Sequence, residues 1–376
     1  MRYRKFGQTG AEVSALGLGC MRFPTIQNGE KRKIDEEQAF EMIKYAYENG
    51  VNYYDTAYTY HDGESETFLG EALKRLGVRD KVYIADKSPL WLVNSPEDFD
   101  RIFDEQLNRL QTDYIDFYLL HSMCKDYWDK TKKFDILEKC ERLKSEGKIR
   151  HFGFSFHDEF DVFKEIVDSY DKWEFCQIQF NYADTKIQAG LKGLEYATGK
   201  GLGVVIMEPI KGGKLADPAA HIKEALGGAR TPVESALDFV WNYEEVSLLL
   251  SGMSDMEQLK ENIRLADKSA PGSLTESERS AIMKAGELFN SATLVQCTGC
   301  RYCTPCPGGL DIPKIFSLYN KSGLEYTWEG DSKKEYDKLP VRADSCLTCG
   351  KCEDVCPQSL PIVTLMGDID RRFNGR

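Results

Sequence analysis

Between about residues 14 and 265, short apolar runs alternate with stretches that have the periodicity of amphipathic helices. The runs are almost continuous in apolar, β-branched and aromatic residues, which is typical of strands that are buried on both faces. Eight such repeats within about 250 residues are typical of a (β/α)8 barrel, also called a TIM barrel. The eight runs are VSALGLGC, VNYYDTA, VYIADKS, YIDFYLLH, IRHFGFSF, FCQIQFNY, GVVIMEP and VSLLLSGM.

A doubly wound open sheet is the alternative for a chain in which strands and helices alternate. Such a sheet needs a glycine-rich phosphate-binding turn that opens a helix directly after the first strand. The segment GLGCMRFP stands at that point, and no helical pattern opens there. The sequence therefore favours the closed barrel, with an irregular excursion at residues 211–231 after the seventh strand.

The segment SPEDFDRIFDEQLNRL shows how the intervening helices are specified. Ser95 is suited to cap a helix, and Pro96 is suited to its first position. Apolar residues then recur at helical spacing and predict one buried face. These residues are Phe99, Ile102, Phe103, Leu107 and Leu110.

The charge and hydropathy of the chain exclude several classes of partner. The formal net charge is -12 over 376 residues, which argues against binding to nucleic acids or anionic membranes. No apolar stretch has the length of a bilayer-spanning helix, and the opening MRYRKFGQTG is too polar for a secretory signal. We therefore expect a cytoplasmic protein, in which twelve reduced cysteines serve metal or redox chemistry.

Eight of the cysteines lie in two dense runs near the end of the chain. The second run has the spacing C-x2-C-x2-C-x3-C-P of bacterial ferredoxins, and the first is one residue shorter before its last cysteine. In two-cluster ferredoxins, the fourth cysteine of each run serves the other cluster. This predicts one [4Fe-4S] cluster on Cys297, Cys300, Cys303 and Cys356, and a second on Cys346, Cys349, Cys352 and Cys306.

A pair of structural zinc sites is the alternative for these cysteines. A zinc ribbon needs two C-x2-C pairs for each ion and does not use a third step or a trailing proline. The spacing therefore favours iron and sulfur. We expect residues 1–290 to form the barrel and residues 291–376 to form an α-helical and loop domain that resembles ferredoxin. That segment looks poor in core residues, so we expect it to need its clusters in order to fold.

Four polar residues fall at the carboxyl ends of strands two, three and four, which form the catalytic face of such a barrel. Each has an ordinary explanation. Tyr60 could belong to a tyrosine-rich loop, Lys87 could reach solvent, and His121 could be a core histidine. Ionisable residues that end three consecutive apolar strands are difficult to explain by packing, because buried charges are costly unless they are paired. We therefore predict a catalytic group of Asp55, Tyr60, Lys87 and His121.

The order Asp55, Tyr60, Lys87 and His121 resembles the aldo-keto reductase family. The segments NYYDTAYTYHDGESETFLGEAL, HFGFSFHD and SGMSDMEQLKEN share this resemblance, which extends from residue 1 to about 290. The C-terminal part resembles the subgroup that carries a ferredoxin-type extension. The resemblance implies that a nicotinamide delivers hydride to an aldehyde, ketone or quinone-like carbonyl.

Catalytic roles follow from the same resemblance. Tyr60 would be the acid, Lys87 would stabilise its anion, Asp55 would hold Lys87, and His121 would orient the carbonyl. The histidines at positions 61, 151 and 157 match no catalytic position and are expected on the surface or in loops.

The resemblance also implies cofactor contacts. Ser155 and Gln177 match carboxamide-binding positions, and Met207 stands where a stacking tyrosine is common. Met253 and Leu259 replace basic residues that often meet a 2′-phosphate, so both NADPH and NADH remain options. The predicted cofactor-binding residues are Gly19, Cys20, Met21, Asp55, Ser155, Gln177, Met207, Ser254, Gln258 and Asn262. Cys20 could equally be a small buried hydrophobe.

The two halves of the chain pose a redox problem. A nicotinamide gives two electrons at once, whereas an iron–sulfur cluster accepts one. The clusters could be structural, a flavin in the barrel could split the electron pair, or a ferredoxin or flavodoxin partner could feed electrons through the clusters. A barrel without catalytic activity, in a chain that serves only electron transfer, is the alternative from a different class.

Overall fold

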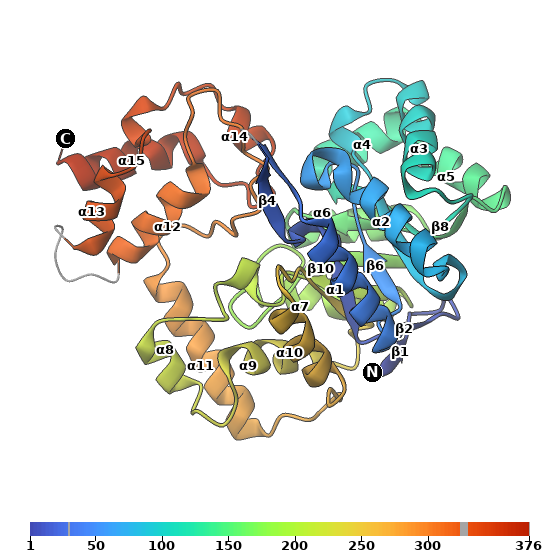
Figure 1. Cartoon of the computed structure of the whole chain (residues 1–376), viewed down its shortest axis with the longest axis horizontal. Coiled ribbons are helices and arrows are strands. Elements are labelled where there is room, and N and C mark those ends of the chain that lie inside the picture. The colour runs from blue at the N-terminus through green and yellow to red at the C-terminus, as the bar shows by residue number, and fades with distance from the viewer. Residues whose placement is uncertain (29–30, 324–329, 376) are drawn as a thin grey trace. The chain divides into compact units, whose positions relative to one another are not determined.

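Eight parallel strands close into a barrel in the computed structural model, which describes residues 1–28, 31–323 and 330–375 (Figure 1). Each strand pairs with its neighbour along the chain, and the last strand pairs with the first. This confirms the predicted barrel and all eight predicted strands. The strands are β3 (Leu16–Gly19), β6 (Tyr53–Asp55), β7 (Tyr83–Ser88), β8 (Ile115–Met123), β9 (Ile149–Phe156), β10 (Phe175–Gln179), β11 (Gly203–Met207) and β12 (Leu248–Ser251).

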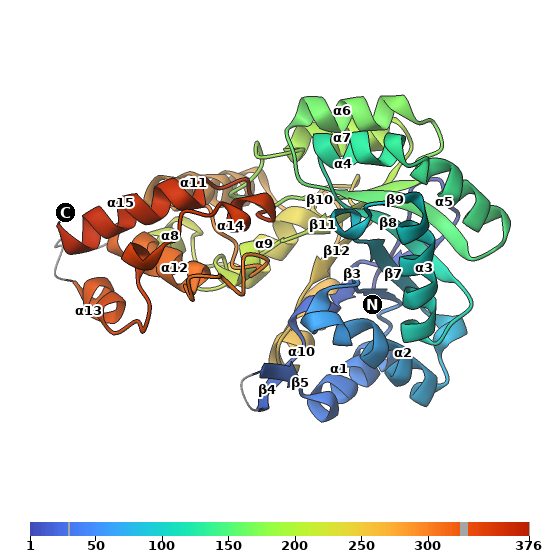
Figure 2. The same ribbon diagram turned by 90° about the horizontal axis from the view of Figure 1, so that it is seen from above.

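Helices cover the outside of the barrel. Figure 2 shows α4, α6 and α7 on one side of the strands and α1, α2 and α10 on the other. The helices are α1 (Glu36–Glu48), α2 (Glu64–Leu76), α3 (Pro96–Leu110), α4 (Lys125–Lys133), α5 (Ile136–Ser145), α6 (Phe160–Ser169), α7 (Gly190–Gly199), α9 (Pro232–Trp241) and α10 (Met256–Ala266).

Helix α3 begins at Pro96, as its sequence predicts. The Asp98 carboxylate accepts a hydrogen bond from the backbone N–H of Ser95 at 3.0 Å, which satisfies a donor at the start of the helix. Four of the five predicted apolar residues are buried, and Leu107 is partly buried. A polar residue, Gln106, is also buried on this face.

A hairpin of β1 (Tyr3–Lys5) and β2 (Glu12–Ser14) precedes the barrel. Phe6 in its turn is fully buried, and its ring lies 4.6 Å from that of Phe117, edge to face. Phe6 belongs to the same apolar cluster as Tyr53, Phe175 and other inward residues of the strands. The interior of the barrel is therefore a packed core, and a reactive site can form at the carboxyl ends of the strands.

A second hairpin, β4 (Thr25–Asn28) with β5 (Lys31–Ile34), follows the first barrel strand. The sequence pattern did not predict it, because TIQNGEKRKI is charged and lacks a regular apolar alternation. The predicted excursion after β11 contains a single 3-10 turn (Lys211–Gly213) and the short helix α8 (Ala220–Ala225).

The chain divides into two compact units. The barrel unit contains Met1–Ile210 and Glu234–Arg279, and the second unit contains Lys211–Val233 and Ser280–Arg376. The second unit contains α8, most of α11 (Glu276–Ala292), α12 (Ile312–Gly323), α13 (Asp331–Asp337), α14 (Lys351–Asp354) and α15 (Ile362–Asn374).

The expectation that the cysteine-rich segment is poor in core residues is wrong. Side chains from α12, α13 and α15 form an apolar cluster in which Ile315, Tyr336 and Ile369 are fully buried. The rings of Tyr336 and Phe373 stack with their centroids 4.3 Å apart. This unit therefore has an apolar core beside its cysteines.

Among the described residues, no helix is both long enough and apolar enough to cross a bilayer.

Candidate active site and cysteine sites

Lys87 and Asp55 form a buried ion pair at the carboxyl ends of β6 and β7. The Lys87 ammonium lies 2.7 Å from Oδ1 of Asp55 and donates to the carbonyl oxygen of Thr56 at 2.7 Å. Burial raises the pKa of Asp55, and the Lys87 ammonium opposes that rise. Oδ2 of Asp55 is buried and has no hydrogen-bond partner among the described residues. The Lys87 ammonium is therefore held in a fixed position, buried beside its counterion.

Tyr60 and His121 face this ion pair. Nζ of Lys87 lies 5.0 Å from the centroid of the Tyr60 ring, and the Tyr60 and His121 ring centroids are 6.2 Å apart, edge to face. Both aromatic side chains are buried. Burial, and then the charge of Lys87, lower the pKa of His121 well below its usual value. A histidine in this state is neutral, so one ring nitrogen can donate and the other can accept.

The backbone after Tyr60 turns sharply. His61, Asp62 and Gly63 have φ angles of 51°, 55° and 90°, all in the left-handed region. A residue other than glycine costs of order 1–3 kcal/mol in such a conformation, so the surrounding structure must hold the turn. The His61 ring stacks on Phe23, with centroids 6.0 Å apart. The turn ends the loop in which Tyr60 is directed inward and leads into α2.

His121 lies at an irregularity in its strand. The register between β8 and β9 shifts between Leu120 and Met123, and Ser122 has a φ of 56°. A β-bulge of this kind changes the direction of the side chains around it. The N–H of Ser122 donates to Oγ of Ser155 at 2.8 Å, which ties the bulge to β9.

Ser155, Gln177 and Met207 lie on three consecutive strands. Ser155 and Gln177 are direct neighbours in the register of β9 and β10, and Nε2 of Gln177 lies 3.5 Å from Sδ of Met207. Oε1 of Gln177 is buried and has no hydrogen-bond partner among the described residues. An amide N–H of a ligand would satisfy this oxygen, which fits the carboxamide of a nicotinamide.

The residues after β12 that are predicted to bind the nucleotide occupy two places in the structure. Oε1 of Gln258 accepts from the N–H of Ser254 at 3.1 Å, and both residues are at the start of α10. Asn262 lies one turn further along α10, is buried, and donates to Oγ of Ser251 at 3.0 Å. Met253 and Leu259 are buried apolar residues.

Gly19, Cys20 and Met21 follow one another at the end of β3. A side chain at Gly19 would lie 3.3 Å from the carbonyl oxygen of Ser251, so glycine permits a close approach of β3 to β12. Cys20 is fully buried, and burial followed by the charge of Asp55 raises the pKa of its thiol well above the usual value. Cys20 is thus a neutral buried thiol. Met21 is partly buried.

The sequence pattern did not predict two residues near the site. The Trp91 ring lies 5.0 Å from the His121 ring and forms a wall beside it. The Arg22 side chain packs over Gly252, where an added Cβ would lie 3.1 Å from Cδ of Arg22. Both residues follow the carboxyl ends of barrel strands, and this position in the sequence could have marked them as candidates for the site.

The expectation that the other histidines lie on the surface or in loops is wrong for His151. His151 lies in β9, stacks on Phe117 at 4.9 Å, and its Nδ1 lies 2.9 Å from Oε1 of Glu174. Burial lowers the pKa of His157 to about 4, opposed by a hydrogen bond to Gln188. His157 lies in the loop after β9, as expected, and its side chain is partly buried.

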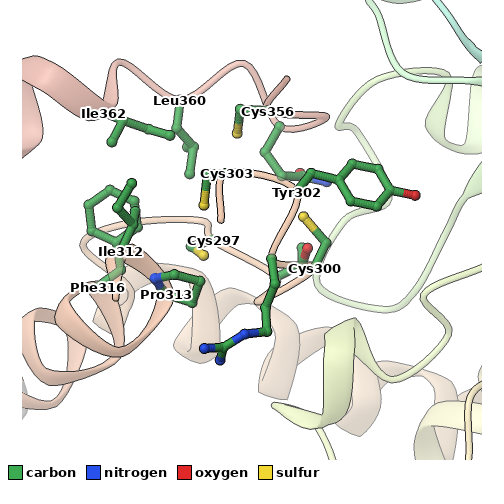
Figure 3. A pocket seen from close by; sticks show the side chains of 13 residues that line it. Cys297, Cys300, Tyr302, Cys303, Ile312, Pro313, Phe316, Cys356, Leu360 and Ile362 are labelled. Atoms are coloured by element: carbon green, nitrogen blue, oxygen red, sulfur yellow. The ribbon is translucent and has the colours of Figure 1, made fainter. Parts of the chain in front are cut away.

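Four cysteines line one cavity in the second unit, and they come from both runs. Figure 3 shows the sulfur atoms of Cys297, Cys300, Cys303 and Cys356 around a common space. Burial, and then the thiols of Cys300, Cys297 and Cys356, raise the pKa of Cys303 to about 12. The set matches the first predicted cluster, in which Cys356 crosses over from the second run.

Other groups in this cavity suit an iron–sulfur cluster. The N–H of Gly299 donates to Sγ of Cys297 at 3.4 Å. Oγ1 of Thr298 is buried without a hydrogen-bond partner among the described residues, so its hydroxyl is available to a sulfide. The remaining lining is mostly apolar and includes Phe316 and Ile362.

The second set of cysteines is more open to solvent. Burial is the first cause of a raised pKa at Cys352, and the nearby thiols of Cys346 and Cys306 contribute. Cys349 is exposed. Cys306 from the first run therefore lies near the second run, as the crossed arrangement predicts.

The described residues contain no group of three or more His, Cys, Asp or Glu side chains placed to hold a single metal ion. Thiolates around one zinc ion would be roughly 4 Å apart, since each Zn–S bond is about 2.3 Å long. The described cysteines are not grouped for one such ion, and their spacing in the sequence favours a cluster.

Comparisons with known proteins also distinguish a barrel region from a cysteine-rich region. Residues 15–276 match the model of the "Aldo/keto reductase family", and residues 296–361 match that of a "4Fe-4S dicluster domain". The chain is 29% identical over 316 residues to "Uncharacterized oxidoreductase YqkF" of Bacillus subtilis, covering 75% of this chain and 95% of the relative. It is 28% identical over 286 residues to "L-galactose dehydrogenase" of Arabidopsis thaliana, covering 69% and 86%.

Solved structures give the same result. The chain superposes on the holo form of aldo-keto reductase AKR11C1 from Bacillus halodurans with a TM-score of 0.63 and 28% identity, covering 76% of this chain and 96% of that chain. The strand order, the matched barrel region and the matched cysteine region lead to one conclusion. The chain belongs to the aldo/keto reductase family of oxidoreductases and carries a 4Fe-4S dicluster domain.

Proposed function

We propose that the barrel reduces a carbonyl group of a small aldehyde, ketone or quinone-like compound with NADH or NADPH. The observation that carries this proposal is the position of the Lys87 ammonium, which lies 2.7 Å from the Asp55 carboxylate and 5.0 Å from the centroid of the Tyr60 ring. An ordinary phenol, with a pKa of about 10, is a poor acid at neutral pH. A buried cation beside the phenol stabilises the phenolate and so makes proton donation easier.

Each polar side chain takes one role in this proposal. The nicotinamide, when bound, supplies a hydride to the carbonyl carbon. The Tyr60 hydroxyl gives its proton to the carbonyl oxygen, and Lys87 stabilises the tyrosinate that is left. Asp55 holds the ammonium in place. Neutral His121 donates a hydrogen bond to the same carbonyl oxygen and orients it, because its pKa is too low for it to carry a charge at neutral pH.

The cofactor would be held by residues from several strands. Oε1 of Gln177 and the Ser155 hydroxyl would bind the carboxamide, and Met207 would pack against the nicotinamide ring. Ser254, Gln258 and Asn262 would bind the adenine end, and the chain at Gly19, Cys20 and Met21 would border the cofactor. Buried Met253 and Leu259 at the positions of the usual basic residues support NADH over NADPH.

We also propose that the second unit holds two [4Fe-4S] clusters in the crossed arrangement described above. The functional boundary would lie near residue 290, with the barrel at 1–290 and the cluster domain at 291–376. Hydride transfer requires no one-electron carrier, so the clusters would be structural. The family matches support nicotinamide and iron–sulfur sites and lend no support to a flavin.

Anaerobic purification followed by a visible spectrum tests this function. NADH and NADPH would be added in turn, first alone and then with aldehydes, ketones and quinones. We expect oxidation of the nucleotide and formation of the alcohol, without bleaching of the clusters by the nucleotide alone. Bleaching by the nucleotide would show electron exchange with the clusters. An absence of carbonyl turnover across these substrate classes would refute the proposed reaction.

A further inference from the structure

Two carboxyl groups lie behind Lys87, on the outer side of the barrel wall. Asp86 precedes Lys87 in β7, so its side chain points to the opposite face of the strand, toward the covering helices. Glu66 comes from α2, and both side chains are fully buried. The Asp86 and Glu66 carboxyl groups are close neighbours, because Nε2 of Gln106 lies within hydrogen-bond distance of both. Two buried carboxyl groups this close can form a hydrogen bond with each other only if one of them carries a proton.

Gln106 of α3 connects this pair to the backbone of Lys87. Its Nε2 lies 2.8 Å from Oδ2 of Asp86, 3.1 Å from Oε1 of Glu66 and 3.0 Å from the carbonyl oxygen of Lys87. The Tyr118 hydroxyl donates to Oε1 of Gln106 at 2.7 Å, which fixes the orientation of the amide. Oδ1 of Asp86 accepts from the N–H of Lys87 at 2.8 Å. Both the N–H and the C=O of Lys87 are therefore held from this side.

The cations around the pair are too few for two ionised carboxylates. Nη1 of Arg109 lies 2.8 Å from Oε2 of Glu66, whereas the Lys87 ammonium is paired with Asp55 on the other face of the strand. Burial, and then the charge of Glu66, raise the pKa of Asp86 well above its usual value. The other titratable groups that face the pair are the Tyr118 hydroxyl and the buried thiol of Cys20, and neither adds a positive charge.

We propose that Asp86 and Glu66 share one proton and that this pair, with a single negative charge, positions Lys87 from the outer side of the barrel. The single negative charge of the pair then balances the positive charge of Arg109. In the same way, the negative charge of Asp55 balances the positive charge of Lys87. The site can accept the negative charge of the tyrosinate at Tyr60 without a second carboxylate opposing it. The positioning role rests on the proposed function, whereas the shared proton does not.

Infrared spectroscopy of the full-length, cluster-loaded protein tests the shared proton directly. We expect a carboxylic-acid C=O band at neutral pH that shifts only slowly in D2O, because the group is buried. The band should disappear in Glu66→Gln and in Asp86→Asn. It should persist in Asp100→Asn, which changes a partly exposed carboxylate that pairs with Lys139 and Arg142. If a variant fails to fold, the band of the unaltered protein still shows whether a buried carboxyl group is protonated. Its absence at neutral pH, or its persistence in folded Glu66→Gln and Asp86→Asn, would overturn the proposal.

The pH profile of carbonyl reduction tests the positioning role. Each single amide variant leaves one negative charge at the pair, so the alkaline limb of kcat/KM should stay in place. The double variant Glu66→Gln with Asp86→Asn removes that charge and should move the limb to lower pH, by about one unit. A shift in the single variants as large as that in the double variant would contradict a pair with one charge. If no carbonyl is reduced at all, the proposed function fails, while the infrared result still decides the shared proton.

Discussion

Nζ of Lys87 and Oδ1 of Asp55 lie 2.7 Å apart, and both side chains are buried. Removal of one partner from a buried pair leaves an uncompensated charge, which typically costs about 3–5 kcal/mol. We expect Lys87→Met to destabilise the barrel by an amount of this order in denaturant unfolding. The double variant Asp55→Asn with Lys87→Met should recover part of the loss, because it leaves no isolated carboxylate.

Lys33→Met is the matched control for that experiment. Lys33 pairs with Glu64 at 3.7 Å, and both side chains are about half exposed. Exposed pairs contribute about 0–1 kcal/mol, so the control should change the free energy of unfolding little. Equal losses in Lys87→Met and Lys33→Met would show that the buried pair does not act as described.

Gln177→Met should weaken nucleotide binding without harm to the fold. Oε1 of Gln177 is buried and lacks a hydrogen-bond partner among the described residues, so methionine removes an unsatisfied polar atom. A lost hydrogen bond of about 1 kcal/mol corresponds to a roughly five- to tenfold rise in the Kd of NADH. Titration calorimetry and thermal unfolding would measure both effects. Gln38→Met, on the exposed surface of α1, should change neither, and an unchanged Kd in Gln177→Met would remove Gln177 from the cofactor site.

Serine variants of the cysteines should fall into crossed groups. Cys356→Ser should have the same effect on the iron content and electron paramagnetic resonance spectrum as Cys297→Ser, because both residues would hold the first cluster. Cys306→Ser should match Cys346→Ser in the same way. The opposite grouping, in which Cys356→Ser matches Cys346→Ser, would show that each run holds its own cluster.

His157 should make the barrel less stable in mild acid. Burial lowers the pKa of His157 to about 4, whereas an unfolded histidine has a pKa of about 6.5. The unfolded chain then binds more protons as the pH falls through this interval, so the free energy of unfolding decreases. His157→Gln should flatten this decrease, measured as the difference from the unaltered protein.

His221→Gln is the control for the acid experiment, because His221 is exposed on α8. The slope with pH should be the same in His221→Gln and the unaltered protein. An equally steep decrease in His157→Gln would mean that His157 is not the titrating group.

The sequence predicted the barrel because strands buried on both faces are recognisable without any structure. The first predicted strand, VSALGLGC, is divided between two strands of the structure. Val13 and Ser14 pair with the chain at Arg4 and Tyr3 in a hairpin, and the barrel strand begins only at Leu16. This division depends on which segment each residue pairs with. A local apolar pattern carries no information about that pairing.

The strand ends predicted part of the site for a similar reason. Parallel strands bring their carboxyl ends to one edge, so Asp55, Lys87 and His121 could be expected together. The contact between Glu66 and Asp86 could not be expected, because it depends on how α2 packs against β7. Gln106 gave a weak signal as a polar residue on an otherwise apolar helical face. The position of Cys356 in one cavity with Cys297, Cys300 and Cys303 could be expected from the ferredoxin spacing, in which the fourth cysteine of a run serves the other cluster.

Turnover by Tyr60→Phe, measured together with nucleotide binding, tests the central claim most directly. Loss of a positioned acid typically costs a factor of about 100–10,000 in rate, so kcat for carbonyl reduction should fall by that much while the Kd of NADH stays the same. Tyr58→Phe, which removes a nearby hydroxyl that donates to Glu105, should keep most of the activity. A Tyr60→Phe enzyme that binds the nucleotide and keeps the full kcat would contradict the account.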